Sequence, residues 1–157
     1  MITIARRRLY EIEAAGENAY PCECCGLLVG RKLVDRARGW HIERVVASEN
    51  LAAAERADRF EVDPRVQIRL QRELRGSGLS VIGVYHSHPD GQALPSAHDL
   101  AQANDPELVW LVTAVSKGRA IGTTAHVLDP NGGAFLEAEL RIIGIGTGKT
   151  PKPSKNT

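Results

Sequence analysis

The sequence reads YHSHPDGQALPSAHD at residues 85–99, with three histidines and two aspartates in one short stretch. The apolar residues VIGVY lead into it and predict a buried strand that ends on His86 and His88. Because side chains alternate along a strand, these two imidazoles face the same side. Pro89 then ends the strand, and Ser96 predicts the N-cap of a short helix after a loop. A strand end, a loop and a helix start are therefore expected to meet around these polar side chains.

The spacing of these residues is compatible with a metal site. Imidazoles at positions i and i+2 of a strand can reach one ion at about 2.0–2.1 Å, and Asp99 in the first helical turn can swing its carboxylate toward them. Two histidines and one aspartate leave the fourth tetrahedral position for water, which is typical of a catalytic zinc site. Histidine pairs also occur on ordinary strands, so these residues alone leave a polar, histidine-rich loop as the alternative.

The rest of the chain predicts strands and helices around one sheet. Periodicity and turn residues predict helices at 4–18, 64–75 and 96–103, and strands at 25–31, 38–50, 79–88, 107–115 and 119–129. Asp63 before Pro64 predicts a helix N-cap with proline in the first turn. Residues 51–58 read as loop or helical turn, Phe60 and Val62 as a brief strand, and 134–145 as a last strand or a helix. This order implies an α/β or α+β domain.

Composition and charge fit one globular domain. The chain has 157 residues and a formal net charge of +1, so nothing predicts binding to nucleic acid or to a membrane. No apolar run reaches the roughly 18 residues of a spanning helix, and we expect no signal peptide. The three cysteines lie at 22–25, too close together for a disulfide framework, which fits a reducing cytoplasm. The polar segment 145–157 is expected to be a disordered tail after a domain at 1–144.

Two motifs together resemble a known family. The first is His86-Ser87-His88-Pro89, six further residues, and then Ser96-x-x-Asp99. The second surrounds Glu23 and reads Pro21-Cys22-Glu23-Cys24-Cys25-Gly26-Leu27-Leu28-Val29-Gly30. Both resemble motifs of the JAMM/MPN+ zinc metalloproteases, in their compact bacterial branch, and the resemblance covers about residues 4–142. It implies a single MPN-like domain, with a curved mixed β-sheet packed with helices.

The resemblance also assigns roles to residues. It implies Zn²⁺ held by His86, His88 and Asp99, with Glu23 as the general base and Ser96 as the hydrogen-bond donor to the oxyanion. Each of the last two residues keeps an ordinary alternative. Ser96 can serve as a helix N-cap, whose hydroxyl we do not expect to satisfy both partners fully at once, and Glu23 can be a surface acid beside Pro21.

The implied activity is zinc-dependent hydrolysis of a peptide or isopeptide bond, at the C-terminal Gly-Gly tail of a ubiquitin-like sulfur-carrier protein. Three alternatives stay open: a non-catalytic MPN scaffold, a deubiquitinase-like isopeptidase, and a metal or redox protein built on the cysteines. All four ligand and base positions are filled, which argues against the scaffold. The sequence allows a homodimer and leaves the oligomeric state undecided.

Other histidines and cysteines form weaker patterns. Pro21-Cys22-x-x-Cys25 and His41-x-Glu43 imitate a zinc nucleobase deaminase, but in deaminases the histidine motif comes first and the cysteines open a helix. Here the cysteines lead into an apolar strand, so we expect Cys25 to be a core residue and the other two thiols to be inert. We expect His98 to be exposed or to contact a metal ligand without binding the metal itself. Ordinary packing or exposure is expected for His41 and His126.

Overall fold

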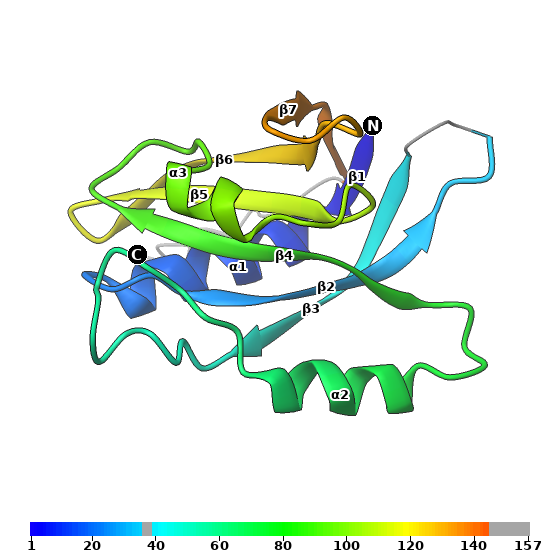
Figure 1. The fold of residues 1–157 in the computed structure, drawn as a ribbon, viewed down its shortest axis with the longest axis horizontal. Helices are drawn as coiled ribbons and strands as arrows, with labels where there is room; N and C mark the ends of the chain where they lie inside the picture. Colours follow the sequence, from blue (N-terminus) through cyan, green and yellow to red (C-terminus); the bar gives the residue numbers. More distant parts are fainter. Residues whose placement is uncertain (36–38, 145–157) are drawn as a thin grey trace, which may run out of the picture.

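The computed structural model describes residues 1–35 and 39–144 (Figure 1). Their elements are, in chain order, β1 (Ile2–Ala5), α1 (Arg6–Ala19), β2 (Cys25–Lys32), β3 (Trp40–Ser48), α2 (Pro64–Glu73), β4 (Ser80–Pro89), α3 (Ala97–Gln102), β5 (Val109–Ser116), β6 (Arg119–Leu128), β7 (Phe135–Ala138) and β8 (Leu140–Ile143). The expected tail at 145–157, and Arg38 at the start of one predicted strand, lie outside the described residues.

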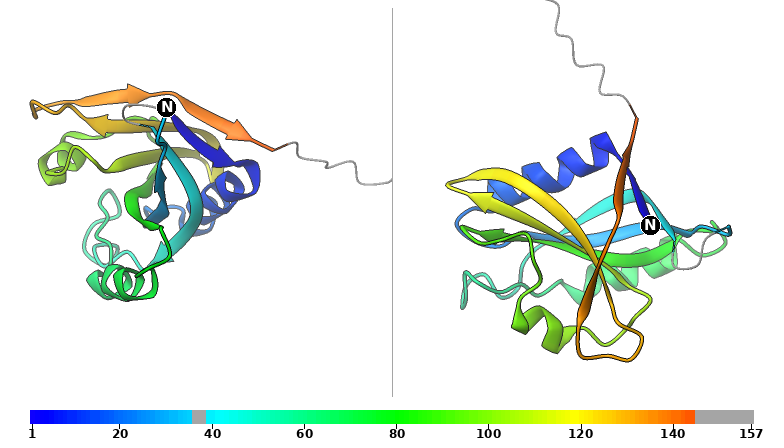
Figure 2. Two further views of the ribbon diagram at one scale, coloured as in Figure 1. Left: turned by 90° about the vertical axis from the view of Figure 1, so that its right-hand side faces the viewer. Right: turned by 90° about the horizontal axis from the view of Figure 1, so that it is seen from above.

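All eight of these strands form one sheet, in the order β7-β6-β5-β4-β2-β3-β1-β8. The β4–β5, β1–β3 and β1–β8 pairs are parallel and the others antiparallel. Only Glu139 separates β7 from β8, yet these strands pair at opposite ends of the order, so the segment carrying them bridges both edges of a strongly curved sheet (Figure 2). The curved mixed sheet packed with helices that the resemblance implied is confirmed.

Helix α1 covers one face of the sheet. Its Leu9 and Ile12 are buried in the main core cluster, together with Leu28 of β2. Gly16 lies inside this helix, at a position where a Cβ would come within 3.0 Å of Val115 and 3.3 Å of Ser87. The glycine therefore allows the helix to approach the sheet closely.

The predicted start of this helix was wrong. Ile4, expected on its apolar face, belongs to β1, and Ile2 and Ile4 are both fully buried. These β-branched residues alternate with Thr3, a pattern that suits a strand, and β1 pairs in parallel with both β3 and β8. Pairing on both sides overrides the helical periodicity, and the helix begins only at Arg6.

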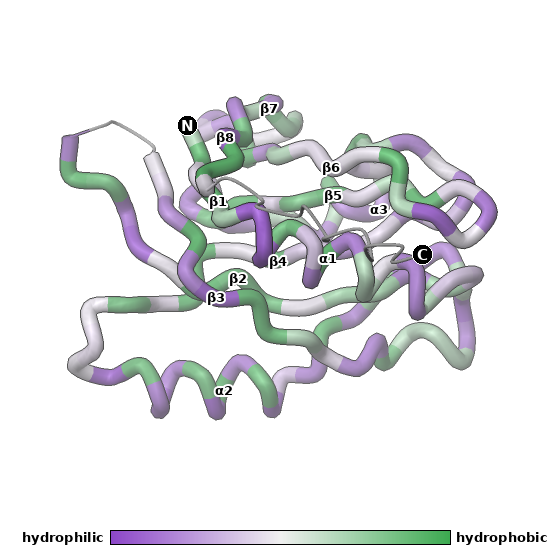
Figure 3. The backbone as a smooth tube through the Cα atoms, turned by 180° about the vertical axis from the view of Figure 1, so that it is seen from behind, coloured by the Kyte–Doolittle hydropathy of each residue, from purple (hydrophilic) through white to green (hydrophobic). Residues whose placement is uncertain are grey.

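Helix α2 covers the opposite face. Leu70 and Leu74 pack against Leu27 and Val29 of β2 in a second cluster. As predicted, Asp63 is the N-cap: its side chain accepts a hydrogen bond from the backbone N–H of Arg65. Helices on both faces explain why the central strands are apolar almost throughout, whereas α2 alternates between hydrophobic and hydrophilic residues (Figure 3).

Two open predictions are settled by the fold. Within the segment predicted at 134–145, the described residues 134–144 contain two short strands, β7 and β8, and the helix alternative is wrong. The segment 51–58 forms turns, and the brief strand expected near Val62 is an isolated bridge to Asn50. No helix in the described part of the chain is long and apolar enough to cross a membrane.

Candidate active site

The register of β2 and β4 brings the two sequence motifs together. Cys25 pairs with His86 in this antiparallel ladder, and the backbone N–H of Cys24 donates to the hydroxyl of Ser87 at 2.8 Å. Two residues before Cys25, Glu23 therefore stands opposite His88, two residues after His86. The Oε1 atom of Glu23 lies 3.8 Å from Nε2 of His88. Strand pairing alone thus places Glu23 at the histidines, although more than sixty positions separate them in the chain.

Three potential metal ligands converge at the end of β4. Nε2 of His86 lies 3.1 Å from Nε2 of His88, and Oδ2 of Asp99 lies 3.0 Å and 3.2 Å from these two nitrogens. Atoms bound tetrahedrally to zinc at about 2.05 Å stand about 3.3 Å from one another. The three atoms are thus spaced like one face of a zinc tetrahedron, and this group of side chains could hold a metal ion. The prediction that both imidazoles face the same side is confirmed.

Neighbouring groups fix the orientation of the two histidines in different ways. Nδ1 of His88 lies 3.0 Å from the backbone carbonyl of Gln92, to which it can donate, and this leaves Nε2 free as a ligand. Nδ1 of His86 has no hydrogen-bond partner among the described residues. The His86 ring is fully buried and instead stacks on Phe60, with ring centroids 4.3 Å apart and planes at 21°.

The electrostatics suit metal binding. Burial lowers the pKa of His86, so its imidazole is neutral and can act as a ligand. Burial alone would raise the pKa of Asp99, but hydrogen bonds from both histidines hold it below its usual range and keep the carboxylate ionised. Burial would also lower the pKa of His88, yet the hydrogen bond to Asp99 raises it, so a metal that binds Nε2 would displace a proton from this ring. An ionised carboxylate beside imidazoles is a donor set that zinc accepts.

Glu23 is a buried carboxyl group rather than a surface acid. Its side chain is 4% exposed, and its Oε2 atom has no hydrogen-bond partner among the described residues. Burial raises the pKa of Glu23 to about 8. In the absence of a metal, burial thus favours the protonated carboxyl, which has to lose its proton before it can act as a base. The alternative of an ordinary exposed acid does not fit this burial.

Ser96 and Asp99 form a capping box at the start of α3. The hydroxyl oxygen of Ser96 accepts from the backbone N–H of Asp99 at 3.1 Å, and Oδ2 of Asp99 accepts from the backbone N–H of Ser96 at 2.7 Å. A hydroxyl group carries one donor hydrogen besides its acceptor lone pairs. The cap therefore uses Ser96 only as an acceptor and leaves its hydrogen available. Whether this hydrogen donates to an oxyanion stays a prediction.

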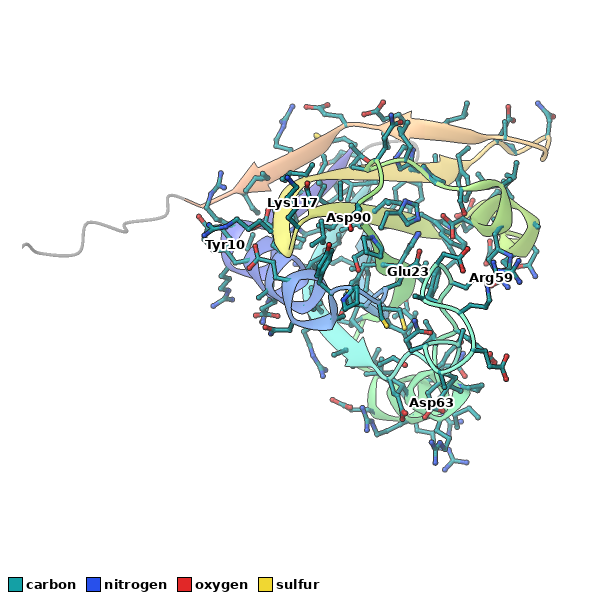
Figure 4. The ribbon with its side chains drawn as sticks, turned by 90° about the vertical axis from the view of Figure 1, so that its left-hand side faces the viewer. Tyr10, Glu23, Arg59, Asp63, Asp90 and Lys117 are labelled. Carbon is teal, nitrogen blue, oxygen red and sulfur yellow. The ribbon has the colours of Figure 1, made fainter. Side chains whose placement is uncertain are left out.

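A cleft of about 440 Å³ opens over these residues, lined by Pro21, Glu23, Ala57, Asp58, His88, Pro89, Asp90, Gly91 and Ser96. Glu23, Asp90 and Arg59 lie on the same side of the molecule (Figure 4). Asp90 holds one wall of the cleft: its carboxylate accepts from the hydroxyl of Tyr20 at 2.6 Å and from the backbone N–H of Lys117 at 2.9 Å. Of the four ligand and base residues, Glu23 and His88 line this cleft, whereas His86 and Asp99 are buried beneath it.

The cysteines and His98 do not belong to the candidate metal site. Cys24 and Cys25 are buried free thiols, and burial raises the pKa of Cys25 to about 12, which makes it an unreactive core residue. No cysteine belongs to the metal-binding group found among the described residues, so the deaminase-like pattern is not assembled. His98 contacts Gln102 and takes no part in the site.

The sequence analysis missed two residues at the site. Phe60 was expected in a brief strand, and its ring stacks on His86. Asn50 was given no role, although its side chain donates a hydrogen bond to the backbone carbonyl of Glu23. Neither belongs to a motif that spacing could reveal. The only local signal was the aromatic residue itself, which every core contains.

Comparison with known proteins agrees with this geometry. Residues 6–125 match the profile described as prokaryotic homologs of the JAB domain. The chain is 32% identical over 129 residues to a desampylase of Haloferax volcanii, covering 82% of this chain and 83% of that protein. It is 31% identical to a probable TtuB-protein conjugate cleaving protease of Thermus thermophilus, covering 66% and 64%, and 29% identical to a CysO-cysteine peptidase of Mycobacterium tuberculosis, covering 83% of each chain.

Solved structures extend the likeness to the fold. A protein from Desulfitobacterium hafniense superposes with a TM-score of 0.76 at 31% identity, covering 91% of this chain and 93% of that one. A JAB1/MPN domain protein from Archaeoglobus fulgidus superposes with a TM-score of 0.57 at 20% identity, covering 91% and 98%, and supports the fold alone. With the profile match and the assembled residues, these findings show that the chain belongs to the prokaryotic JAB domain family.

Proposed function

We propose that this protein is a zinc metallopeptidase that hydrolyses a peptide or isopeptide bond at the C-terminal Gly-Gly tail of a ubiquitin-like sulfur-carrier protein. One observation carries the proposal. His86, His88 and Asp99 present three ligand atoms 3.0–3.2 Å apart, with the buried carboxyl of Glu23 beside them and a cleft above.

A zinc ion in this site would supply Lewis-acid chemistry, lowering the pKa of a water molecule to near 7 and polarising the scissile carbonyl. The residues of the chain do the rest. Glu23 accepts a proton from the attacking water and returns it to the leaving amine as the C–N bond breaks. The free hydrogen of the Ser96 hydroxyl donates to the oxygen that becomes negative in the tetrahedral intermediate.

The proposed substrate rests on chemistry and on the relatives. One relative is named for cleaving TtuB-protein conjugates and another for acting on CysO-cysteine. The cleft is lined by small residues, Ala57 and Gly91, and by no lysine or arginine among the described residues. A Gly-Gly tail has no side chains that would clash in such a space. The bond is cut between the second glycine and a cysteine, a short extension or a lysine side chain, in that order of preference.

The test uses zinc-loaded protein and candidate carriers from its own genome, each with one or two residues beyond Gly-Gly. Intact mass should show release of those residues by the wild type and not by a Glu23→Gln variant. If no carrier is trimmed while a lysine-linked ubiquitin-type dimer is cut efficiently, the substrate is wrong and the deubiquitinase-like alternative holds. If the protein binds no zinc and cuts nothing, the scaffold alternative replaces the enzyme. A cytoplasmic location suits the three free thiols.

A further inference from the structure

We propose that Phe60 and Asn50 are positioning residues of this active site: Phe60 holds the plane of the His86 imidazole, and Asn50 ties the segment that carries Phe60 to the backbone of Glu23. The inference rests on the proposed zinc site and adds two residues to it. It starts from an irregularity, namely that one ligand histidine lacks the hydrogen bond that normally orients such a ring.

A metal-binding imidazole must present its ligand nitrogen in a fixed direction. The ligand lone pair lies in the plane of the ring, so rotation of the ring about its bond to Cβ moves that lone pair off the ion. His88 is held against rotation through Gln92, but Nδ1 of His86 finds no partner in residues 1–35 and 39–144. Some other contact has to fix the plane of His86.

Phe60 provides that contact. Its ring lies nearly parallel to the imidazole, 4.3 Å away at 21°, and both side chains are buried. The ring of Trp110 meets the same imidazole edge-on, at 6.0 Å and 90°. A flat ring packed on a flat ring resists rotation, because turning either one drives ring atoms into the other. Phe60 thus does by packing what a hydrogen bond does for His88.

Asn50 fixes the segment from which Phe60 projects. Its side-chain amide donates to the backbone carbonyls of Glu23 and Arg59, at 3.0 Å and 2.9 Å, and accepts from the N–H groups of Ala52 and Glu61, both at 3.0 Å. Two donors and two acceptors use the full capacity of an amide, which settles its orientation. The bonded residues flank Phe60 on both sides and include Glu23. The side chain of Asn50 therefore fixes the position of Phe60 relative to Glu23.

The test measures zinc affinity first, by competition with a chromogenic chelator, and activity second. Phe60→Leu should weaken zinc binding by about 10–100-fold, as loss of a ligand-orienting partner typically does. Phe135→Leu is the matched control. It removes the same ring from the same aromatic cluster, where Phe135 contacts Trp110 and His126 but not His86. This variant should leave the affinity within about twofold of the wild type. If the leucine variant is unfolded, Phe60→Met keeps the volume without the flat ring.

Asn50→Asp gives a second, independent readout. The change keeps the shape but replaces the two N–H donors that bond to Glu23 and Arg59, so kcat should fall by about tenfold or more while KM changes by less than about threefold. The exposed Asn104→Asp is its control. Zinc binding by Phe60→Leu as tight as the wild type, or a wild-type kcat for Asn50→Asp, overturns the inference. A wild type that binds no zinc overturns the proposed function instead, so the two failures are distinguishable.

Discussion

Replacement of Ser96 by alanine tests two roles of one hydroxyl group, the helix cap that the structure shows and the oxyanion donor that we propose. The oxygen accepts from the backbone N–H of Asp99 and caps α3, while the hydrogen is left to donate to the oxyanion. The substitution removes both interactions at once. It leaves the bond from the backbone N–H of Ser96 to Oδ2 of Asp99, because that donor belongs to the main chain. The metal ligand therefore keeps its anchor, and we expect zinc to be retained.

The two losses differ in size and in the quantity that reports them. A lost serine cap typically costs about 1 kcal/mol of folding free energy, and the exposure of Ser96 to water makes a larger cost unexpected. A lost oxyanion donor costs about 10²–10³ in kcat, equivalent to about 2.7–4 kcal/mol of transition-state stabilisation. We therefore expect a small fall in stability together with a much larger fall in rate, at unchanged zinc content.

The assay combines urea denaturation, zinc analysis and kcat on a carrier with an extended Gly-Gly tail. Ser77→Ala is the matched control, because Ser77 also makes two local hydrogen bonds, to Leu74 and from Leu79, in the turn after α2. It should lose comparable stability and keep its kcat. A Ser96→Ala protein that loses about 1 kcal/mol but turns over within threefold of the wild type would refute the oxyanion role and leave Ser96 as a cap alone.

Three further changes test the remaining assignments. Glu23→Gln should keep zinc and lose about 10²–10⁴ in rate, because it removes the base without removing a ligand; near-normal turnover would contradict that role. His88→Ala should strip the metal while circular dichroism still reports the folded sheet, since the core clusters do not include this residue; His98→Ala, the control, should retain zinc. Cys22→Ser should leave zinc content unchanged, and loss of the metal would revive the cysteine-based reading.

Much of the fold could be predicted because local rules and tertiary packing agree. The Asp63 cap, the strand into His86 and the helix start at Ser96 each follow from a few adjacent residues. The predictions failed where pairing with a strand distant in sequence determines the secondary structure. Ile4 suits a helix face equally well until β8, contributed by the other end of the chain, pairs with it in parallel.

The candidate site likewise has features that the sequence predicts and features that it does not. Alternation along β4 predicts that His86 and His88 share a face, and the family motif supplies Asp99 and Glu23. What spacing cannot give is the β2–β4 register that sets Glu23 opposite His88, or the stacking of Phe60 on His86. Register depends on matching whole strands, and an aromatic contact depends on a loop whose path a single sequence does not encode locally.

The buried polar atoms that lack a hydrogen-bond partner gather around the proposed metal site. Three buried side-chain atoms of the described residues lack a hydrogen-bond partner, and they belong to Glu23, His86 and Trp110. The first two line the site, and the ring of Trp110 lies against His86. A buried polar group without a partner destabilises a protein by about 1–3 kcal/mol, so packing alone would favour apolar residues at these positions. Locally unfavourable choices that gather around one group of metal ligands are the pattern expected when chemistry, rather than stability, determines the residues.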